Sequence, residues 1–158
     1  MLRIGYGEDT HRLVENRKLV LAGIEIPFEL GLLGHSDADV LTHAIIDALL
    51  GACALGDIGS LFPDTSDEFS GISSLILLER TMKLIRNKGF EPINVDATLI
   101  AQKPRLAGYR DEMRKCIAAA ASMPIDRISI KFTTPEYLGP EGRLESMSAR
   151  AVALVCSE

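Results

Sequence analysis

The chain has 158 residues, of which 47% are hydrophobic and 25% are charged, and its formal net charge is -5. This length and apolar content suffice for one sizeable core, so we expect residues 1–158 to form a single domain. Because Lys and Arg are interspersed among the acids, no basic stripe of the kind that binds a nucleic-acid backbone is present, and we expect no nucleic-acid partner.

The first predicted elements are two strands and a helix. Residues 2–13 and 18–26 are rich in β-favouring side chains and are separated by polar residues, which predicts the two strands of a hairpin. Over residues 36–54, apolar side chains recur at the helical spacing. Ser36 is the expected N-cap of this helix, and Asp39 follows three residues later.

The rest of the chain alternates helices with strands. Residues 73–87 and about 106–121 have helical patterns. Residues 93–102 alternate between apolar and polar side chains, as a half-buried strand does, and residues 127–134 and 146–157 are predicted as two more strands. This order predicts an α+β fold in which a layer of helices covers one face of a sheet.

Cysteine usage and apolar runs bear on the compartment. Cys53, Cys116 and Cys156 are odd in number and lie among small apolar residues, as free thiols in a reducing compartment do. The N-terminal residues contain no apolar signal core, and the longest apolar stretch is shorter than a membrane span of about 18 residues and is interrupted by Asp47. We therefore expect a cytoplasmic protein without a membrane partner.

One group of residues has the composition of a metal site. Asp9 and His11 stand two positions apart on a predicted strand, so their side chains project from the same face. His43 lies one helical turn after Asp39 and one turn before Asp47, on a polar stripe. One carboxylate and two neutral imidazoles suit zinc, with a fourth position left open for an anionic oxygen. The alternative is a surface pair on the strand and a hydrogen-bonded histidine on the helix.

Two further segments offer partners for a phosphate. His35 and Ser36 precede the predicted helix, whose free N–H groups favour an anion, although a plain capping box has the same composition. Near the end of the strand at 127–134, Thr133 and Thr134 offer hydroxyl donors and Glu136 offers an oxygen ligand for Mg²⁺. The alternative there is an exposed strand end.

A loop rich in glycine and acids follows the first predicted helix. In residues 55–66, Asp57 and Asp64 stand among Gly, Ser and Pro. Acid side chains and backbone amides of such a loop can bind the hydroxyls of a polyol, but the same composition is common in turns. The two interpretations stay open on this evidence.

Four segments together point to a known family. They are GEDTH at 7–11, GLLGHSDADVLTHAIIDALLGACALGDIGSLFPDT at 31–65, VDATLIAQKPR at 95–105 and KFTTPEYLG at 131–139. The chain closely resembles the 2-C-methyl-D-erythritol 2,4-cyclodiphosphate synthases of the non-mevalonate route to isoprenoids, over nearly its whole length.

The resemblance implies a homotrimer, with the sheets facing the three-fold axis and active sites between subunits. Each subunit would contain a four-stranded mixed sheet plus a small β-hairpin. The implied substrate is 4-diphosphocytidyl-2-C-methyl-D-erythritol 2-phosphate. Its 2-phosphate attacks its own β-phosphate, which releases CMP and the cyclic diphosphate.

The resemblance also implies roles for individual residues. Asp9, His11 and His43 match the ligands of one zinc ion per subunit, and Glu136 matches a ligand of Mg²⁺ or Mn²⁺. His35 and Thr134 match positions that stabilise the transition state. The remaining matched positions are substrate-binding: Ser36, Asp57, Ile58, Gly59, Phe62, Pro63, Asp64, Thr65, Ser66, Ala101, Pro104, Arg105, Leu106, Thr133 and Arg143. Residues 101–106 and Thr133 would hold the cytidine from the neighbouring subunit.

Two other functions compete with the synthase. A zinc-dependent phosphohydrolase acting on a nucleotide-like substrate would use the same zinc to activate water, and would yield free phosphate in place of a cyclic product. A trimeric binding module without catalysis would have no use for the four predicted metal ligands. The reaction product therefore separates the alternatives.

Overall fold

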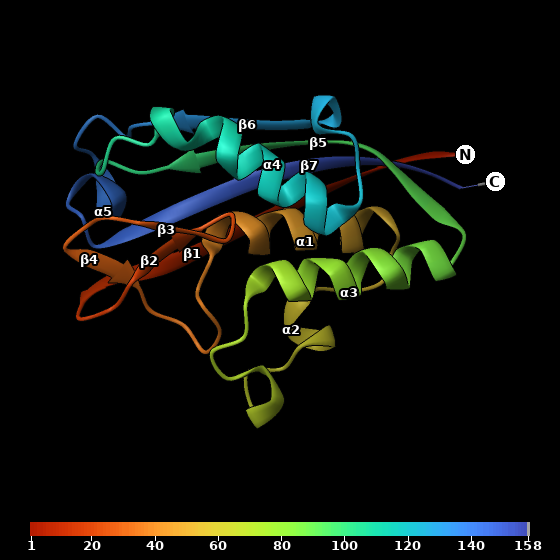
Figure 1. The fold of residues 1–158 in the computed structure, drawn as a ribbon, viewed down its shortest axis with the longest axis horizontal. Coiled ribbons are helices and arrows are strands. Elements are labelled where there is room, and N and C mark those ends of the chain that lie inside the picture. The colour runs from red at the N-terminus through yellow and green to blue at the C-terminus, as the bar shows by residue number, and fades with distance from the viewer. Residues whose placement is uncertain (158) are drawn as a thin grey trace.

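Two long antiparallel strands, β1 (Leu2–Glu15) and β7 (Ser146–Ser157), form the middle of the sheet. A computed structural model describes residues 1–157 (Figure 1). The five strands lie in the order β4-β1-β7-β5-β6, with β4 at Leu30–Leu32, β5 at Phe90–Ile100 and β6 at Ile128–Thr133. Strands β5 and β6 are parallel and the other neighbours are antiparallel, so the sheet is mixed, as predicted.

Three helices cover one face of this sheet (Figure 1). They are α1 (Val40–Ala52), α3 (Ser74–Asn87) and α4 (Arg110–Ala121). Short helical segments connect the larger elements: α2 (Ile58–Leu61), η1 (Asp67–Phe69), η2 (Ala107–Tyr109), η3 (Ile125–Arg127) and α5 (Gly139–Gly142). The predicted α+β fold with helices on one face is confirmed.

The alternation of side chains along β7 explains why only one face is covered. Met147, Ala149 and Ala151 point toward α1 and are buried, whereas Arg150 and Val152 point to the other face and are exposed. The small side chains let α1 lie close to the sheet, and almost every residue of α1 is buried as a result. Packing on all sides thus fixes the position of α1, and with it the position of the side chains on its first turn.

Two glycines bring β1 against the backbone of α1. A Cβ at Gly5 would lie 1.9 Å from the carbonyl oxygen of Ala48, and one at Gly7 would lie 2.1 Å from that of Ala44. No side chain fits at these distances, so glycine is required for the close approach. Two residues along β1 correspond to about one turn back along α1, so the next residue on this face, Asp9, reaches the first turn of the helix.

The number of strands differs from the prediction. The sheet has five strands instead of four, because β4 pairs with β1 through the register Leu13 to Leu32. At three residues around Gly31, β4 is too short to show an alternating pattern.

The first predicted hairpin is also wrong. Residues 2–13 pair with β7 and β4, and residues 18–26 fold back on themselves as β2 (Leu19–Leu21) and β3 (Ile24–Ile26). Ala22 and Gly23 make the turn with positive φ angles of 50° and 74°. A strand of 14 residues gains far more pairing from the 12 residues of β7 than from this short segment, which explains the outcome.

The third predicted helix begins later than expected. Residues 107–109 form the 3-10 segment η2, and α4 starts at Arg110. Helix ends are the least certain part of such predictions, and 3-10 turns at the start of a helix are common.

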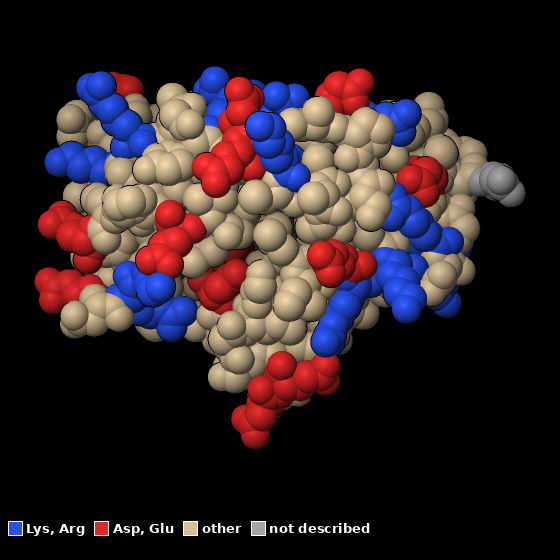
Figure 2. Space-filling view, in the orientation of Figure 1, with Lys and Arg blue, Asp and Glu red and all other residues tan. Residues whose placement is uncertain are grey.

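Charged side chains of both signs are distributed over the face shown in Figure 2. Acidic side chains gather on the projecting segment at the bottom of this view, where η1 carries Asp67 and Glu68. Within residues 1–157, no helix has the length and apolar character needed to cross a membrane.

Candidate metal centre and active site

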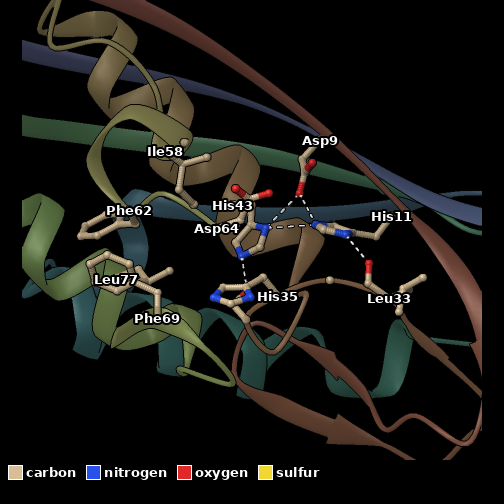
Figure 3. A pocket seen from close by; sticks show the side chains of 13 residues that line it. Asp9, His11, Leu33, His35, His43, Ile58, Phe62, Asp64, Phe69 and Leu77 are labelled. Atoms are coloured by element: carbon tan, nitrogen blue, oxygen red, sulfur yellow. Dashed lines mark hydrogen bonds and ion pairs between the residues drawn. The ribbon is translucent and has the colours of Figure 1, made fainter. Parts of the chain in front are cut away.

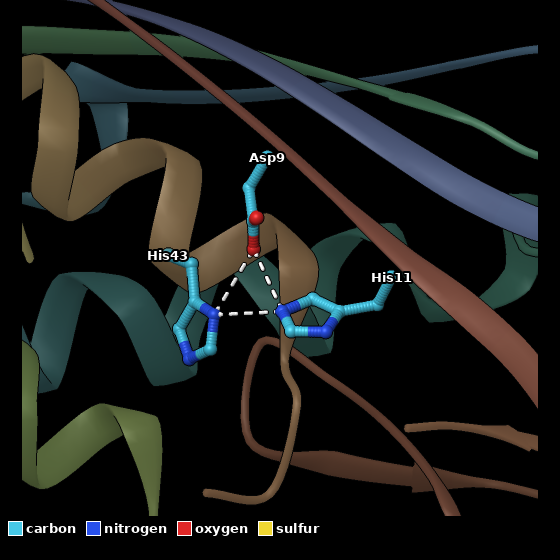
Figure 4. A group of neighbouring side chains, drawn as sticks. All are labelled: Asp9, His11 and His43. Atoms are coloured by element: carbon cyan, nitrogen blue, oxygen red, sulfur yellow. Dashed lines mark hydrogen bonds and ion pairs between the residues drawn. The ribbon is translucent and has the colours of Figure 1, made fainter. Parts of the chain in front are cut away.

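Asp9, His11 and His43 come together between β1 and the first turn of α1 (Figure 4). Asp9 Oδ2 lies 2.9 Å from His11 Nε2 and 3.0 Å from His43 Nδ1, and these two nitrogens lie 3.2 Å apart. Asp9 and His11 meet because they are two positions apart on one strand face. The grouping predicted from the sequence is therefore present in the structure.

Hydrogen bonds fix which ring nitrogens face the cluster. The carbonyl oxygen of Leu33 lies 2.7 Å from Nδ1 of His11, so this nitrogen donates its hydrogen there and Nε2 keeps a lone pair. On His43 the roles are reversed: Nε2 lies 2.8 Å from the hydroxyl of Ser74, and Nδ1 faces the cluster. Two lone pairs and a carboxylate oxygen then face one another, which requires a proton or a metal cation between them.

The spacing of the three atoms fits a tetrahedral ion. Ligand atoms bound to zinc at 2.0 to 2.1 Å lie about 3.3 Å apart, close to the 2.9 to 3.2 Å found here. Three protein ligands of this kind leave a fourth position for substrate or water, which is typical of catalytic zinc sites. The residues present therefore fit a divalent metal.

Neighbouring charges shift the pKa values within the cluster. Burial by itself raises the pKa of Asp9, but hydrogen bonds to His11 and His43 outweigh it and hold that pKa well below its ordinary value. Burial lowers the pKa of His11, but the hydrogen bond and charge of Asp9 outweigh it and raise that pKa. The carboxylate is thus always ionised near neutral pH, and protonation of His11 opposes metal binding on acidification.

A pocket of about 380 Å³ opens beside the cluster (Figure 3). Apolar side chains form the wall opposite the cluster, and the rings of Phe62 and Phe69 pack edge to face with centroids 5.4 Å apart. The pocket thus has one polar, ligand-bearing side and one apolar side. Nine of the predicted site residues line it: Asp9, His11, His35, Ser36, His43, Ile58, Gly59, Phe62 and Asp64.

The start of α1 differs from the prediction. Asp39 is the N-cap in place of Ser36, and its carboxylate accepts hydrogen bonds from the amide and hydroxyl of Thr42 at 3.1 and 2.7 Å and from the amide of Gly23 at 2.8 Å. The carboxylate of Asp39 therefore occupies this helix end, and a phosphate does not have free access to it. Ser36 instead points its hydroxyl toward His43 Nε2 at 3.2 Å.

Two of the three residues on the polar stripe of α1 are buried. Asp39 is fully buried and His43 is 7% exposed, so neither is a solvent-facing position. Burial, reinforced by the charge of Asp37, raises the pKa of Asp39. On the next turn, Asp47 Oδ1 accepts the amide of Ile58 at 2.7 Å, which ties the following loop to the helix.

The loop with Asp57 forms one rim of the pocket. Asp57 caps α2 by accepting the amide and hydroxyl of Ser60, each at 2.7 Å, and these hydrogen bonds lower its pKa. His35 Nε2 donates to the carbonyl oxygen of Ser66 at 3.0 Å and so ties the end of the loop across the pocket. Pro63 and Thr65 lie in the exposed stretch between these anchors.

Six of the other predicted site residues line a second pocket, of about 200 Å³. This pocket shares no lining residue with the first. It lies between the ends of β5 and β6 and contains Ala101, Pro104, Arg105, Leu106, Thr133 and Thr134. The predicted site is thus divided into two separate halves within one chain.

Glu136 stands beside this second pocket in a strained loop. The hydroxyl of Thr134 donates to Glu136 Oε1 at 2.6 Å. Glu136 and Tyr137 have φ angles of 55° and 64°, in the left-handed region that side chains rarely adopt. The amide of Tyr137 donates to Oε1 of Gln102 at 2.8 Å, which helps to hold this conformation. Strain of this kind is found most often at functional sites.

The two halves lie at the same level of the sheet. Thr10, between Asp9 and His11, pairs with Ser148, which pairs with Ile100, which pairs with Thr133. Three strand spacings separate the ends of this row, or about 14 Å. Arg143 lines neither pocket, and its guanidinium donates to the carboxylate of Glu145 at 2.8 and 3.1 Å.

Some residues of the site had no sequence signal. Leu33 contributes only a carbonyl oxygen, and Ser74 and Gln102 act through hydrogen bonds between distant parts of the chain. Asp37 was visible as an acid near the predicted helix, but its partner Ser74 is 37 residues away. Such pairs become recognisable only when the fold is known.

Residues 2–156 match the model of the YgbB family. The chain belongs to the YgbB family.

Curated members of this family are similar over their full length. The 2-C-methyl-D-erythritol 2,4-cyclodiphosphate synthase of Clostridium beijerinckii is 59% identical over 154 residues, which cover 98% of each chain. The protein of that name from Syntrophobacter fumaroxidans is 54% identical over 157 residues, which cover 99% of each chain.

Solved structures of the family have the same fold. The bifunctional IspDF from Campylobacter jejuni matches all of this chain with a TM-score of 0.96 and 41% identity, and the match covers 43% of the IspDF chain. A CDP-bound form of 2C-methyl-D-erythritol-2,4-cyclodiphosphate synthase matches with a TM-score of 0.89 and 42% identity, over 98% of this chain and 100% of the other.

Proposed function

We propose that this chain is a 2-C-methyl-D-erythritol 2,4-cyclodiphosphate synthase, a phosphorus–oxygen lyase of isoprenoid precursor biosynthesis. Its substrate is 4-diphosphocytidyl-2-C-methyl-D-erythritol 2-phosphate, and its products are the 2,4-cyclodiphosphate and CMP. The single observation that carries this proposal is the Asp9, His11 and His43 cluster facing a pocket, in a chain 59% identical to a synthase over its whole length.

The metal assignments extend the proposal. Asp9, His11 and His43 hold one Zn²⁺ per chain, and Glu136 holds Mg²⁺ or Mn²⁺. Both ions supply positive charge to phosphate oxygens. The donor types support this division, because imidazole nitrogens favour zinc and a lone exposed carboxylate favours a hard ion shared with substrate phosphates.

The division of the site supports a homotrimer whose active sites lie between copies. One chain presents the first pocket, and the neighbouring chain presents the second pocket with Thr133, Thr134 and Glu136. The exposed apolar side chains on the uncovered sheet face, among them Ile4, Tyr6 and Val152, support an arrangement in which the sheets face the three-fold axis.

The reaction needs positioning more than an enzyme nucleophile. The attacking 2-phosphate and the β-phosphate belong to one molecule, so folding that molecule between the two pockets brings the reacting atoms together. Ser36, Asp57, Ile58, Gly59 and residues 62–66 contact the methylerythritol part, and residues 101–106 with Thr133 contact the cytidine. His35 and Thr134 donate hydrogen bonds to the phosphoryl group as charge develops on it.

The compartment is part of the same proposal. Cys53, Cys116 and Cys156 are all free thiols. Free thiols of this kind support a reducing compartment, and we infer that the enzyme acts in the cytoplasm without a nucleic-acid or membrane partner.

Phosphorus NMR tests the proposed reaction. The purified protein is incubated with the diphosphocytidyl substrate and Mg²⁺, with and without a zinc chelator. The cyclic diphosphate signal together with CMP, lost on chelation, is the expected result. Inorganic phosphate would support the phosphohydrolase instead, and a zinc-containing trimer without turnover would contradict both enzymes.

A further inference from the structure

The ring of His43 is held on the side away from the metal cluster by two residues with no role so far. Ser74 is fully buried, and its hydroxyl lies 2.8 Å from His43 Nε2 and donates to Oδ1 of Asp37. Asp37 is held in turn, because Oδ2 accepts the amide of Ser74 at 2.9 Å and Oδ1 accepts the amide of Asp39 at 3.2 Å. These contacts connect the start of α3 to the first turn of α1.

The chemistry of the three groups fixes where each hydrogen lies. An ionised carboxylate only accepts, so the single hydrogen of the Ser74 hydroxyl points to Asp37. The Ser74 oxygen must then accept from His43, and the ring hydrogen of His43 is placed on Nε2. If the serine hydrogen pointed to His43, two oxygen lone pairs would face each other inside the protein. The Nδ1 lone pair of His43 is consequently directed at Asp9 and His11.

We infer that Asp37 and Ser74 are positioning residues of the zinc centre, acting through His43 by fixing its orientation and the nitrogen that carries its hydrogen. This inference rests on the proposed zinc site. A carboxylate behind a serine also pulls the ring hydrogen toward the serine, which makes Nδ1 a better donor to the metal. Ser36 also approaches Nε2, but at 3.2 Å, and its hydroxyl oxygen accepts the amide of Ala38, whereas the hydroxyl of Ser74 donates to the carboxylate of Asp37.

The test measures metal binding rather than turnover. Metal-free wild type and variants are titrated with zinc in competition with a chromophoric chelator at pH 7.5, and with Co²⁺ to record its visible absorption, which reports the ligand geometry. The variants are Ser74→Ala, Asp37→Asn and their combination. Ser73→Ala is the matched control, because Ser73 is adjacent, is the N-cap of α3 and makes no side-chain capping hydrogen bond. His43→Ala is the reference for a lost ligand.

We expect Ser74→Ala to raise the zinc dissociation constant by about 10- to 100-fold and to change the Co²⁺ bands, with Ser73→Ala equal to wild type. The double variant should lose no more zinc affinity than Ser74→Ala does, because the two residues act in series. Thermal unfolding of the metal-free forms identifies any variant that fails to fold. If Asp37→Asn or the double variant fails, the zinc affinity of Ser74→Ala against that of Ser73→Ala decides.

Several results would overturn the inference. A zinc affinity of Ser74→Ala within about threefold of wild type would do so. So would a loss of zinc affinity in Ser73→Ala equal to that in Ser74→Ala, or additive losses of zinc affinity in the double variant. If wild type binds no zinc, or His43→Ala binds it as well as wild type does, the proposed metal centre itself is wrong and the inference is overturned with it.

Discussion

His11 Nε2 and His43 Nδ1 face each other at 3.2 Å, and each ring has its opposite nitrogen hydrogen-bonded to the protein. The two histidines come from different elements, 32 residues apart, yet both present a lone pair to the same point. With Asp9 Oδ2 as the third corner, this pair is a site prepared for a cation.

Replacing His43 by Ala should abolish zinc binding and lower kcat by at least about 100-fold. Because His43 is buried and hydrogen-bonded to Ser74, we also expect the metal-free protein to lose about 1 to 3 kcal/mol of unfolding free energy. Metal content by mass spectrometry and urea unfolding measure the two effects. His35→Ala is the control, because His35 lies in the pocket outside the cluster: it should lose activity but keep its zinc.

Stabilisation by zinc should increase with pH. In the metal-free protein the pKa of His11 is raised, so the ion pair with Asp9 contributes fully below the unfolded pKa of His11 and is lost as pH rises through its folded pKa. Zinc binds only the unprotonated ring of His11, so the contribution of bound zinc to stability increases as pH rises. The difference in Tm between zinc-bound and metal-free protein, measured from pH 5.5 to 8, should grow steadily. A difference that stays constant over this range would contradict the ligand assignment.

Glu136→Gln should raise the Mg²⁺ concentration needed for half-maximal activity by at least about 10-fold and leave the zinc content unchanged. The amide keeps the size of the side chain but removes its charge. Glu112→Gln, on the exposed face of α4, is the matched control and should behave as wild type. Equal loss of zinc and of Mg²⁺ dependence would show that the two metals do not occupy separate halves of the site.

Mixing two variants that are each inactive at limiting Mg²⁺ should restore activity if each site is shared between copies. In trimers formed at random from equal amounts of His43→Ala and Glu136→Gln chains, about a quarter of the sites combine an intact first half with an intact second half. Refolding the two together, or co-expressing them, should therefore give about a quarter of wild-type activity at limiting Mg²⁺. Activity no higher than that of the separate variants would place both halves in one chain.

Asp39→Ala should lower the free energy of unfolding by about 2 to 4 kcal/mol, because the amides of Thr42 and Gly23 and the hydroxyl of Thr42 lose their buried acceptor together. Urea denaturation measures the change. Asp67→Ala, on the exposed segment η1, should stay within about 0.5 kcal/mol of wild type. If the two substitutions lower the free energy of unfolding equally, Asp39 is not the residue that stabilises the start of α1.

The sequence predicts the positions of helices and strands better than it predicts which strands pair. Helices at 73–87 and strands at 93–102 and 146–157 have clear periodicity, and their structural counterparts agree within a few residues. The hairpin assigned to residues 2–13 and 18–26 was wrong because pairing depends on the competing strand β7, which lies at the other end of the chain.

The site was predictable where its residues lie close together in sequence and obey one periodicity, as Asp9 and His11 do on a strand. The N-cap was assigned to Ser36 because its spacing to Asp39 fits a capping box, but Asp39 caps the helix, and its carboxylate also accepts the amide of Gly23, a partner 16 residues away. Contacts such as Ser74 with His43 depend on how α3 packs on α1, and no local pattern contains that information.

The close approach of β1 to α1 makes Gly5 and Gly7 part of the metal chemistry, although neither has a side chain to offer. A methyl group at either position would displace the strand from the helix, and the ligands on the two elements would separate by more than a zinc ion can bridge. Across the family, we therefore expect these two glycines to be retained together with the metal ligands, so that a member that keeps the metal keeps glycine at both positions.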